Sequence, residues 1–288
     1  MKEYTYQWNA ENADKEDLPI LKITKSSFGS FQWCPKKYEY NYIERLPQET
    51  SDAMWKGTIV HNAREDFFNQ FDIKKAENLN KSELVDYCMS LYPIDDNVEM
   101  YETMSIFEAN RFLESVKEET THQFLPVVNE AKLDAQIVIG RNDNPKFPLQ
   151  RDYIVHLQGI IDRMFQDGQA YIPMELKTGI WKDYKKTMMR KEMAFYKLLF
   201  ESAEEAQLIE NKLDNTVPIT HWSWYYPASN YLFIEEVKNA SVSAVKKGLA
   251  ELVHAYEHRN FPAKYFARTC ASCSYFGICD AANTESWL

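Results

Sequence analysis

The sequence is poor in glycine and cysteine, and it has no long hydrophobic run. Eight glycines among 288 residues argue against the glycine-rich loops that cradle nucleotide phosphates, and the Gly-x4-Gly-Lys-Ser/Thr pattern of an ATPase motor is absent. Five cysteines are too few for a disulfide framework in a chain of this length. No stretch approaches the roughly 18 uninterrupted apolar residues of a membrane span, and no apolar signal segment opens the sequence. We therefore expect a soluble, cytoplasmic protein with no membrane partner.

Positive charge is also scarce. Lys and Arg number 33 against 43 Asp and Glu, which gives a formal net charge of −10. This excludes a histone-like protein that coats nucleic acid by bulk charge, but it leaves room for a local basic groove. The 45% apolar and 26% charged fractions are typical of a folded chain, and the length fits one large domain or two modest ones.

The pattern of apolar residues predicts an α/β (α+β) protein. Helical spacing is found from Thr24, over 54–71 and through 82–125, whereas short β-rich runs separated by turns occupy 131–140, 151–166 and 170–179. A charged helix is expected over 184–205, two paired strands over 219–227 and 231–238, and a last helix over 241–259. We expect residues 1–23 to be a flexible acidic lead-in and 24–288 to be one domain, with a helical lobe at about 62–130, a sheet core at about 131–240 and a C-terminal segment at about 241–288.

The most informative segment joins two of the predicted strands. Asp162 lies on the first, and Glu175-Leu176-Lys177 lies on the second, after a turn at 166–169. Because side chains alternate along a strand, Glu175 and Lys177 share a face, and the turn brings Asp162 beside Glu175. Two carboxylates and a lysine suit metal-dependent phosphodiester hydrolysis, in which Mg²⁺ or Mn²⁺ takes oxygen ligands and a cation stands near the attacking water. The alternative is a pair of structural carboxylates with a salt-bridged lysine.

His61 is the candidate third ligand. Gly57, His61 and Glu65 recur at intervals of four on the predicted helix 54–71 and so share one face. A neutral imidazole could complete a coordination sphere that two carboxylates leave open. A lone helix histidine is more often a satisfied structural residue, so the case for His61 depends on the residues around it.

In this order, Gly57-x3-His61-x3-Glu65, Gly159-x2-Asp162 and Glu175-x-Lys177 resemble the RecB-like branch of the PD-(D/E)XK nuclease superfamily. The resemblance implies a restriction-endonuclease-like mixed sheet core flanked by helices, with a helical insertion lobe. It also implies that the metal is held by His61, Asp162, Glu175 and the backbone carbonyl of Leu176, and that Lys177 assists the attacking water.

The same family usually carries Gln-x3-Tyr on the helix after the sheet, with both side chains on one face. This sequence has Glu192-x3-Tyr196, so the resemblance implies a catalytic role for Tyr196 and for position 192. Glutamate in place of glutamine loses a hydrogen-bond donor and adds a negative charge where a DNA strand would pass. Glu192 is therefore a helper on the metal side, a change that lowers the rate, or a sign that the helix turn is misaligned.

Four of the five cysteines form a set. Cys270-x2-Cys273-x5-Cys279 lies near the end of the sequence, and Cys34 lies far upstream. Four thiolates suit a [4Fe–4S] cluster or a structural Zn²⁺. The uneven spacing resembles the cluster-bearing RecB-like nucleases, including the AddB type and the CRISPR-associated exonucleases, and this implies an iron–sulfur cluster in a C-terminal cysteine-cluster segment. Cys88, on an apolar helix face, is expected to be a buried small hydrophobic residue.

A basic stretch follows the Glu175-x-Lys177 motif. Between 181 and 192 it combines Lys and Arg side chains with aromatic rings, which can contact phosphates and stack on unpaired bases. A solvated helix face is the alternative explanation. The predicted DNA-binding residues are Trp181, Lys182, Lys185, Lys186, Arg190 and Lys191.

Together these features predict a Mg²⁺- or Mn²⁺-dependent deoxyribonuclease. We expect an exonuclease that acts on single-stranded DNA or on free duplex ends and hydrolyses phosphodiester bonds with a metal-bound water. The alternative is a DNA-end-binding or adaptor subunit with weak or no cleavage, and a third reading is a zinc-stapled scaffold that meets no nucleic acid. The expected partners are DNA and a helicase, recombination or CRISPR adaptation protein, in a CRISPR, phage or DNA repair context.

Overall fold

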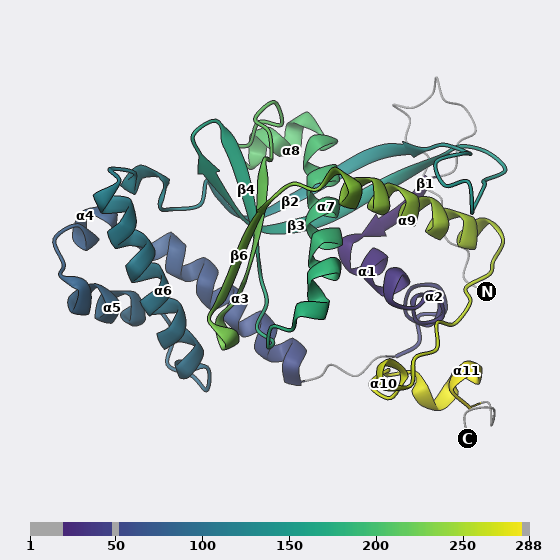
Figure 1. The fold of residues 1–288 in the computed structure, drawn as a ribbon, viewed down its shortest axis with the longest axis horizontal. Helices are drawn as coiled ribbons and strands as arrows, with labels where there is room; N and C mark the ends of the chain where they lie inside the picture. Colours follow the sequence, from purple (N-terminus) through teal and green to yellow (C-terminus); the bar gives the residue numbers. More distant parts are fainter. Residues whose placement is uncertain (1–19, 48–51, 284–288) are drawn as a thin grey trace. The chain divides into compact units, whose positions relative to one another are not determined.

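The computed structural model describes residues 20–47 and 52–283 (Figure 1). These residues form two compact units. The first unit contains Asp134–Gly159, together with the described residues before Thr50 and from Asn239 onward. The second contains those of Thr50–Leu133 and Ile160–Lys238. All residues of the predicted metal site therefore belong to the second unit, and the four-cysteine set belongs to the first.

In the described part of the chain, six strands form one mixed sheet in the order β1-β3-β4-β5-β6, with β2 paired to β3. Parallel pairs are β1 with β3 and β4 with β5, whereas β3 with β4 and β5 with β6 are antiparallel. The predicted α/β class, a mixed sheet flanked by helices as in restriction endonucleases, is confirmed. The strands are β1 (Ile20–Thr24), β2 (Val128–Ile139), β3 (Tyr153–Asp167), β4 (Ala170–Leu176), β5 (His221–Tyr226) and β6 (Tyr231–Glu236).

Strand β1 corrects part of the prediction that residues 1–23 are a lead-in. Leu21 and Ile23 are buried and Lys22 between them is exposed, which is the alternation of a half-buried strand. Because β1 pairs in parallel with β3, it belongs to the folded sheet. The rest of the predicted lead-in, 1–19, lies outside the described residues.

The helices of the first unit follow local signals in the sequence. The helix α1 begins with a capping box, in which the Ser27 N–H donates to Thr24 Oγ1 at 3.0 Å and the Thr24 N–H donates to Ser27 Oγ at 2.9 Å. Helix α9 packs on α1 at Gly248, where an added Cβ would lie 2.7 Å from Gln32 Nε2, so the close approach requires glycine. The helices of this unit are α1 (Lys25–Trp33), α2 (Pro35–Tyr38), a π-helix (Glu39–Ile43), α9 (Asn239–Glu257), α10 (Ala267–Cys270) and α11 (Asp280–Asn283).

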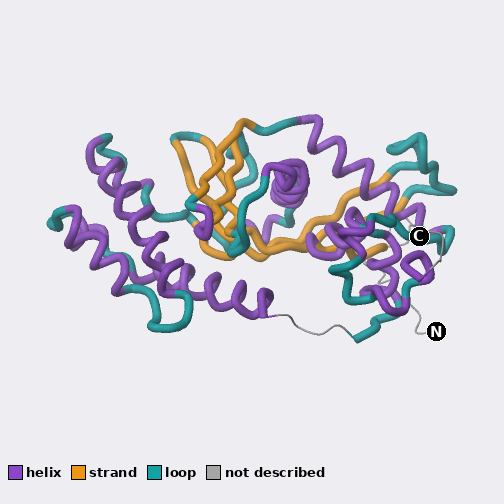
Figure 2. Tube along the Cα trace, turned by 60° about the horizontal axis from the view of Figure 1, so that its bottom comes forward, coloured by secondary structure: helices purple, strands orange, loops and turns teal. Residues whose placement is uncertain are grey.

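In the second unit, strands lie between a helical lobe and the helix α7 (Figure 2). The lobe buries aromatic side chains such as Phe67, Tyr101 and Phe112, which join Leu176 and Tyr225 of the sheet in one apolar core. Burial of this apolar area is the main stabilising term of such a unit. The lobe helices are α3 (Asp52–Gln70), α4 (Ile73–Ala76), α5 (Lys81–Ser90) and α6 (Val98–Lys117), and the chain between β4 and β5 forms α7 (Lys186–Glu201) and α8 (Glu205–Glu210).

The predicted strand pair at the end of the sheet is confirmed as the β5–β6 hairpin. Tyr226 pairs with Tyr231 across a short 3-10 turn at Pro227–Ser229. Asn230 closes the turn in the left-handed region, at φ 42° and ψ 47°, which asparagine tolerates better than most residues. Among the described residues, none of the helices is both long and apolar enough to cross a membrane.

Candidate active site

The predicted carboxylates meet where β4 ends. Arg163 pairs with Met174 in the antiparallel register of β3 and β4, which places the preceding residue Asp162 next to Glu175. The Leu176 N–H donates to Asp162 Oδ2 at 2.9 Å, and Asp162 and Glu175 are 8% and 2% exposed. The strand pairing predicted from the sequence therefore brings both carboxylates to one edge of the sheet.

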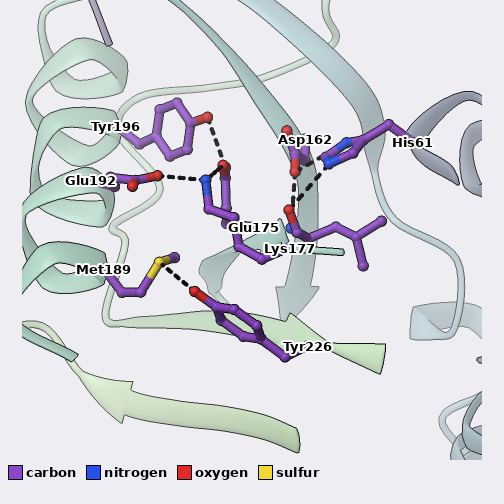
Figure 3. A network of polar contacts seen from close by, with 9 residues as sticks. His61, Asp162, Glu175, Lys177, Met189, Glu192, Tyr196 and Tyr226 are labelled. Atoms are coloured by element: carbon purple, nitrogen blue, oxygen red, sulfur yellow. Dashed lines mark hydrogen bonds and ion pairs between the residues drawn. The ribbon is translucent and has the colours of Figure 1, made fainter. Parts of the chain in front are cut away.

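His61 reaches the same point from the lobe helix α3 (Figure 3). Its Nε2 lies 3.1 Å from the Leu176 carbonyl oxygen, and its Nδ1 lies 3.5 Å from Asp162 Oδ2. Since a carbonyl oxygen only accepts, Nε2 carries the proton in this arrangement. Gly57 of α3 lies beside the residues that follow β4, and a Cβ added there would lie 3.7 Å from Thr178 Oγ1, an ordinary van der Waals contact.

Helix α7 closes the site from the other side. The Tyr196 hydroxyl donates to Glu175 Oε2 at 2.8 Å, and the Lys177 ammonium donates to Glu175 Oε1 at 2.6 Å and to Glu192 Oε2 at 2.8 Å. Residues 192 and 196 are one turn apart, so both face β4 (Figure 3). Glu192 therefore lies in register, and a misaligned helix turn does not explain the missing glutamine. We call Asp162, Glu175, Lys177 and Glu192 the carboxylate–lysine site.

The carboxylate–lysine site holds three carboxylates and one lysine. Burial disfavours the Lys177 ammonium, but the charges of Glu175 and Glu192 and their hydrogen bonds outweigh that effect, so the pKa of Lys177 is raised. Burial, together with the nearby charges of Glu175 and Asp162, raises the pKa of Tyr196 well above its ordinary value. At neutral pH the lysine is charged and the tyrosine is a neutral hydrogen-bond donor.

The donor set of the site fits a divalent metal ion. It offers carboxylate oxygens from Asp162 and Glu175, the carbonyl oxygen of Leu176 and the imidazole of His61, all of which Mn²⁺ accepts, and the oxygens suit Mg²⁺. Among the described residues, no three His, Cys, Asp or Glu side chains are already close enough to hold a metal. Both oxygens of Glu175 contact Lys177 and Tyr196 instead, so a bound metal would compete with these partners.

The predicted DNA-binding residues fall into two groups. Arg190 is engaged inside the unit, because its Nε donates to Glu235 Oε1 at 2.6 Å. The Trp181 ring stacks on Tyr231 at 4.6 Å, and Lys185 Nζ donates to the Ile180 carbonyl at 2.6 Å. Lys182 is exposed, and Lys186 and Lys191 are half-buried. The stretch is thus less uniformly available to a ligand than its composition indicates.

The four cysteines of the predicted metal set line one small cavity of the first unit. The Lys264 N–H donates to Cys34 Sγ at 3.4 Å. The cavity measures about 20 Å³, room for one water or one ion, so a [4Fe–4S] cluster would require the cysteines to move apart. Cys88 of the second unit is fully buried, and burial raises the pKa of its thiol to about 12. It is therefore an inert thiol in an apolar core.

A second charged group, absent from the sequence-based prediction, lies on the lobe side of the sheet. Arg64 of α3 donates to Glu108 of α6 through Nη2, and Arg111 Nε donates to the same carboxylate at 2.8 Å. Arg163 of β3 is 1% exposed, and its Nε and Nη1 have no hydrogen-bond partner in the described part of the chain. Burial, and then the charge of Arg64, lower the pKa of Arg163 to about 10. We call Arg64, Glu108, Arg111 and Arg163 the arginine cluster.

The amphipathic spacing of α6 was the only available signal for this cluster. Glu108 falls on the apolar face of α6 with Met104, Ala109 and Phe112, and a carboxylate at a core position requires a buried cationic partner. The partner Arg64 is 44 positions away in sequence, so it could not be identified from the sequence alone.

Comparison with known proteins identifies the fold family. A model of the PD-(D/E)XK nuclease superfamily matches residues 22–280. The crystal structure of SSO0001 is similar at a TM-score of 0.41 and 14% identity, over 95% of this chain and 93% of that chain. No curated protein matches the chain.

Proposed function

The chain belongs to the PD-(D/E)XK nuclease superfamily, and from this premise we propose that it is an exonuclease that hydrolyses DNA at single-stranded or free ends. The observation that carries the proposal is the meeting of His61, Asp162, Glu175 and Lys177 at the end of β4. These residues come from three separate segments of the chain. Their convergence beside the Leu176 carbonyl is difficult to explain as structural ion pairing alone.

In the proposed reaction, Asp162, Glu175, the Leu176 carbonyl and His61 would hold the metal. A divalent ion bound there would act as a Lewis acid on the phosphate and lower the pKa of the attacking water. The ammonium of Lys177 stabilises the negative charge that develops on the phosphate. The Tyr196 hydroxyl keeps Glu175 oriented, as its 2.8 Å hydrogen bond indicates.

Glu192 is proposed to position Lys177. Its carboxylate holds the Lys177 Nζ at 2.8 Å, and it would keep the ammonium in place after a metal draws Glu175 away. A glutamine at the same position would accept the same hydrogen bond without the charge. Glu192 thus departs from the usual family glutamine, but the hydrogen bond with Lys177 is retained.

DNA would approach along the exposed cations beside the site. Of these cations, Lys182 is exposed, and Lys186 and Lys191 are half-buried. Each phosphate contact that releases counterions makes binding more dependent on salt. Arg190 is proposed to hold α7 to β6 through Glu235.

The four cysteines of the first unit are proposed to hold a [4Fe–4S] cluster, with Zn²⁺ as the alternative. Their convergence on one cavity supports a shared ligand, and four thiolates suit either group. Anaerobic purification followed by iron, sulfide and zinc analysis tests the assignment. A brown protein with absorbance near 400 nm supports the cluster, and a colourless protein with one zinc per chain overturns it.

Cleavage of end-labelled single-stranded and duplex DNA, with Mg²⁺ and Mn²⁺ compared, tests the proposed activity. Wild type should cleave, Lys177→Ala and Asp162→Ala should not, and Lys238→Ala, which changes an exposed lysine of the same unit, should cleave as wild type does. Tight binding of DNA ends without cleavage by the wild type would instead identify an adaptor subunit of a recombination, repair or CRISPR adaptation complex. The contact of Lys177 with two carboxylates is the observation that favours this second reading.

A further inference from the structure

We propose that a cavity between α6 and the β5–β6 turn binds one unpaired nucleotide of the DNA strand. The proposal rests on the nuclease function proposed above and adds a place for a base. The cavity measures about 470 Å³, within the range that holds small organic ligands. It lies entirely in the second unit, where α6 packs against Pro227–Ser229 (Figure 1). Its lining consists of Thr103, Ile106, Phe107, Asn110, Arg111 and Asn230.

One wall of the cavity is flat and apolar. Ile106 is 43% exposed, although it belongs to a helix whose opposite face is buried in the core. The neighbouring Phe107 ring stacks on Tyr225 at 4.4 Å and 20°, so its orientation is fixed by the sheet. Apolar and aromatic surfaces of this kind bind the face of a nucleobase with little dependence on sequence.

Two amides at the rim are available to the edge of a base. The side chains of Asn110 and Asn230 are exposed, and neither makes a hydrogen bond with another residue in the described ranges. Each amide offers a donor group and an acceptor, the combination that pairs with base edges. The left-handed backbone conformation at Asn230 fixes the position of its Cβ atom.

Arg111 supplies a rigid cation beside these amides. Its Nε donates to Glu108 Oε2 and its Nη2 donates to the Phe124 carbonyl, both at 2.8 Å. The guanidinium also lies 4.0 Å from the centre of the Phe124 ring. A cation that is already ordered loses little conformational entropy when it binds a phosphate.

The turn that carries Asn230 is tied to the loop that follows the proposed catalytic lysine. The Trp181 N–H donates to Ser229 Oγ at 2.9 Å, four residues after Lys177 and one residue before Asn230. Because β4 and β5 are parallel, with Leu176 opposite Tyr225, the carboxylate–lysine site and the cavity lie at the same end of these strands. A DNA strand bound at both would pass around that end of the sheet. Because pairing occupies the base edges of a duplex, the amides select an unpaired nucleotide.

Fluorescence anisotropy with labelled single-stranded oligonucleotides tests the proposal on the full chain in EDTA. Each oligonucleotide of the series carries one abasic site, moved one position at a time. For the wild type, one position should weaken binding about tenfold, the loss expected for a stacked and hydrogen-bonded base. The double variant Asn110→Ala/Asn230→Gly should bind the intact strand about tenfold more weakly and show no further loss at that position. Glycine is used at 230 because it adopts φ 42° without strain.

Two controls separate the cavity from general effects. Asn78→Ala, outside the cavity, should bind as the wild type does, and the single variant Ile106→Glu, at an exposed position, should weaken binding without lowering the thermal midpoint. Equal abasic profiles for the wild type and the double variant would overturn the proposal. Calorimetric binding of free deoxynucleoside monophosphate, without any abasic effect, would also overturn it by making the ligand a free nucleotide. Because EDTA prevents cleavage, failure of the proposed nuclease activity would leave this result standing.

Discussion

The carboxylate–lysine site and the arginine cluster lie on opposite faces of the same strands, and they are electrostatic inverses. The first has three carboxylates and one lysine, and the second has three arginines and one glutamate. Adjacent residues of β3, Asp162 and Arg163, face the two groups.

Solvent access separates the two groups. The side chains of Lys177 and Glu192 are 26% and 18% exposed, whereas those of Arg64 and Glu108 are completely buried and only Arg111, at the edge of its cluster, is exposed, to 25%. An open site can tolerate excess negative charge because a cation from solution can enter it. Buried charges need partners within the chain, since an unpaired one costs several kcal/mol, and Glu108 is that partner for Arg64 and Arg111. The open group is therefore suited to bind a metal, and the arginine cluster is suited to hold helices together.

The largest effect on stability should come from removing the carboxylate of the arginine cluster. Glu108→Gln removes the only carboxylate of the arginine cluster and leaves Arg64 and Arg111 without a counter-charge. We expect the free energy of unfolding to fall by about 3–5 kcal/mol, measured by urea denaturation. Glu114→Gln on the same helix, where the glutamate side chain is 61% exposed, should change it by less than about 0.5 kcal/mol. Equal effects of the two variants would show that the buried ion pairs of Glu108 do not stabilise the fold more than an exposed ion pair does.

Neutralising a carboxylate of the carboxylate–lysine site should abolish activity and leave stability nearly unchanged. Asp162→Asn retains an oxygen that accepts from the Leu176 N–H, but it removes a charged metal ligand. Cleavage should fall at least about a hundredfold, while the free energy of unfolding in EDTA stays within about 0.5 kcal/mol of the wild type. A collapse of stability with the loss of cleavage would remove the distinction between the two groups.

A divalent metal ion should raise the free energy of unfolding only by binding at the carboxylate–lysine site. At a Mn²⁺ concentration a hundredfold above the dissociation constant, the wild type should gain about 2.7 kcal/mol, and a chelator should reverse the gain. Asp162→Asn should gain much less, and Lys182→Ala, which changes an exposed lysine near the site, should gain as much as the wild type. A full gain in Asp162→Asn would place the metal elsewhere.

The smallest expected effect tests whether water is excluded from the core beside the arginine cluster. The Cys88 thiol lies near Glu108 and Arg111, and burial, followed by the charge of Glu108, raises its pKa from 9.0 to about 12. The unfolded chain therefore loses this proton above pH 9 while the folded chain keeps it until about pH 12. The stability due to Cys88 is complete below pH 9 and should fall by about 1.4 kcal/mol per pH unit between these values.

Denaturation under reducing conditions at pH 8.5, 9.5 and 10.5 measures this slope. Cys88→Ala should be less stable at pH 8.5 but lose stability less steeply as the pH rises, because it has no thiol to titrate. Parallel curves would mean that water reaches the thiol.

The open site was predictable because its residues follow short rules. Asp162 and Glu175 are linked by one turn, and strand alternation places Glu175 and Lys177 on one face. Tyr196 and Glu192 are related by one helical turn. The roles of Glu192 and Tyr196 depended on the resemblance, and the resemblance also strengthened the case for His61, because nothing local connects α7 or α3 to β4.

Features that depend on distant pairing were not predictable. The arginine cluster joins positions 64, 108, 111 and 163, and Arg190 is held by Glu235. Apart from Glu108, which falls on the apolar face of α6, each of these charges is indistinguishable from a solvated one in the sequence. Strand β1 was assigned to the lead-in because its alternation at Leu21 and Ile23 covers too few residues, and its pairing with β3 is decided by tertiary contact.

One turn of α3 carries both His61, at the open site, and Arg64, in the arginine cluster. This has a consequence for recombination between related genes. A crossover between the codons for residues 61 and 64 would combine the proposed metal ligand of one parent with the buried arginine of the other, whose ion-pair partner on α6 comes from that second parent. We expect viable chimaeras to inherit α3 to α6 as one block, so that the lobe and the histidine are exchanged together.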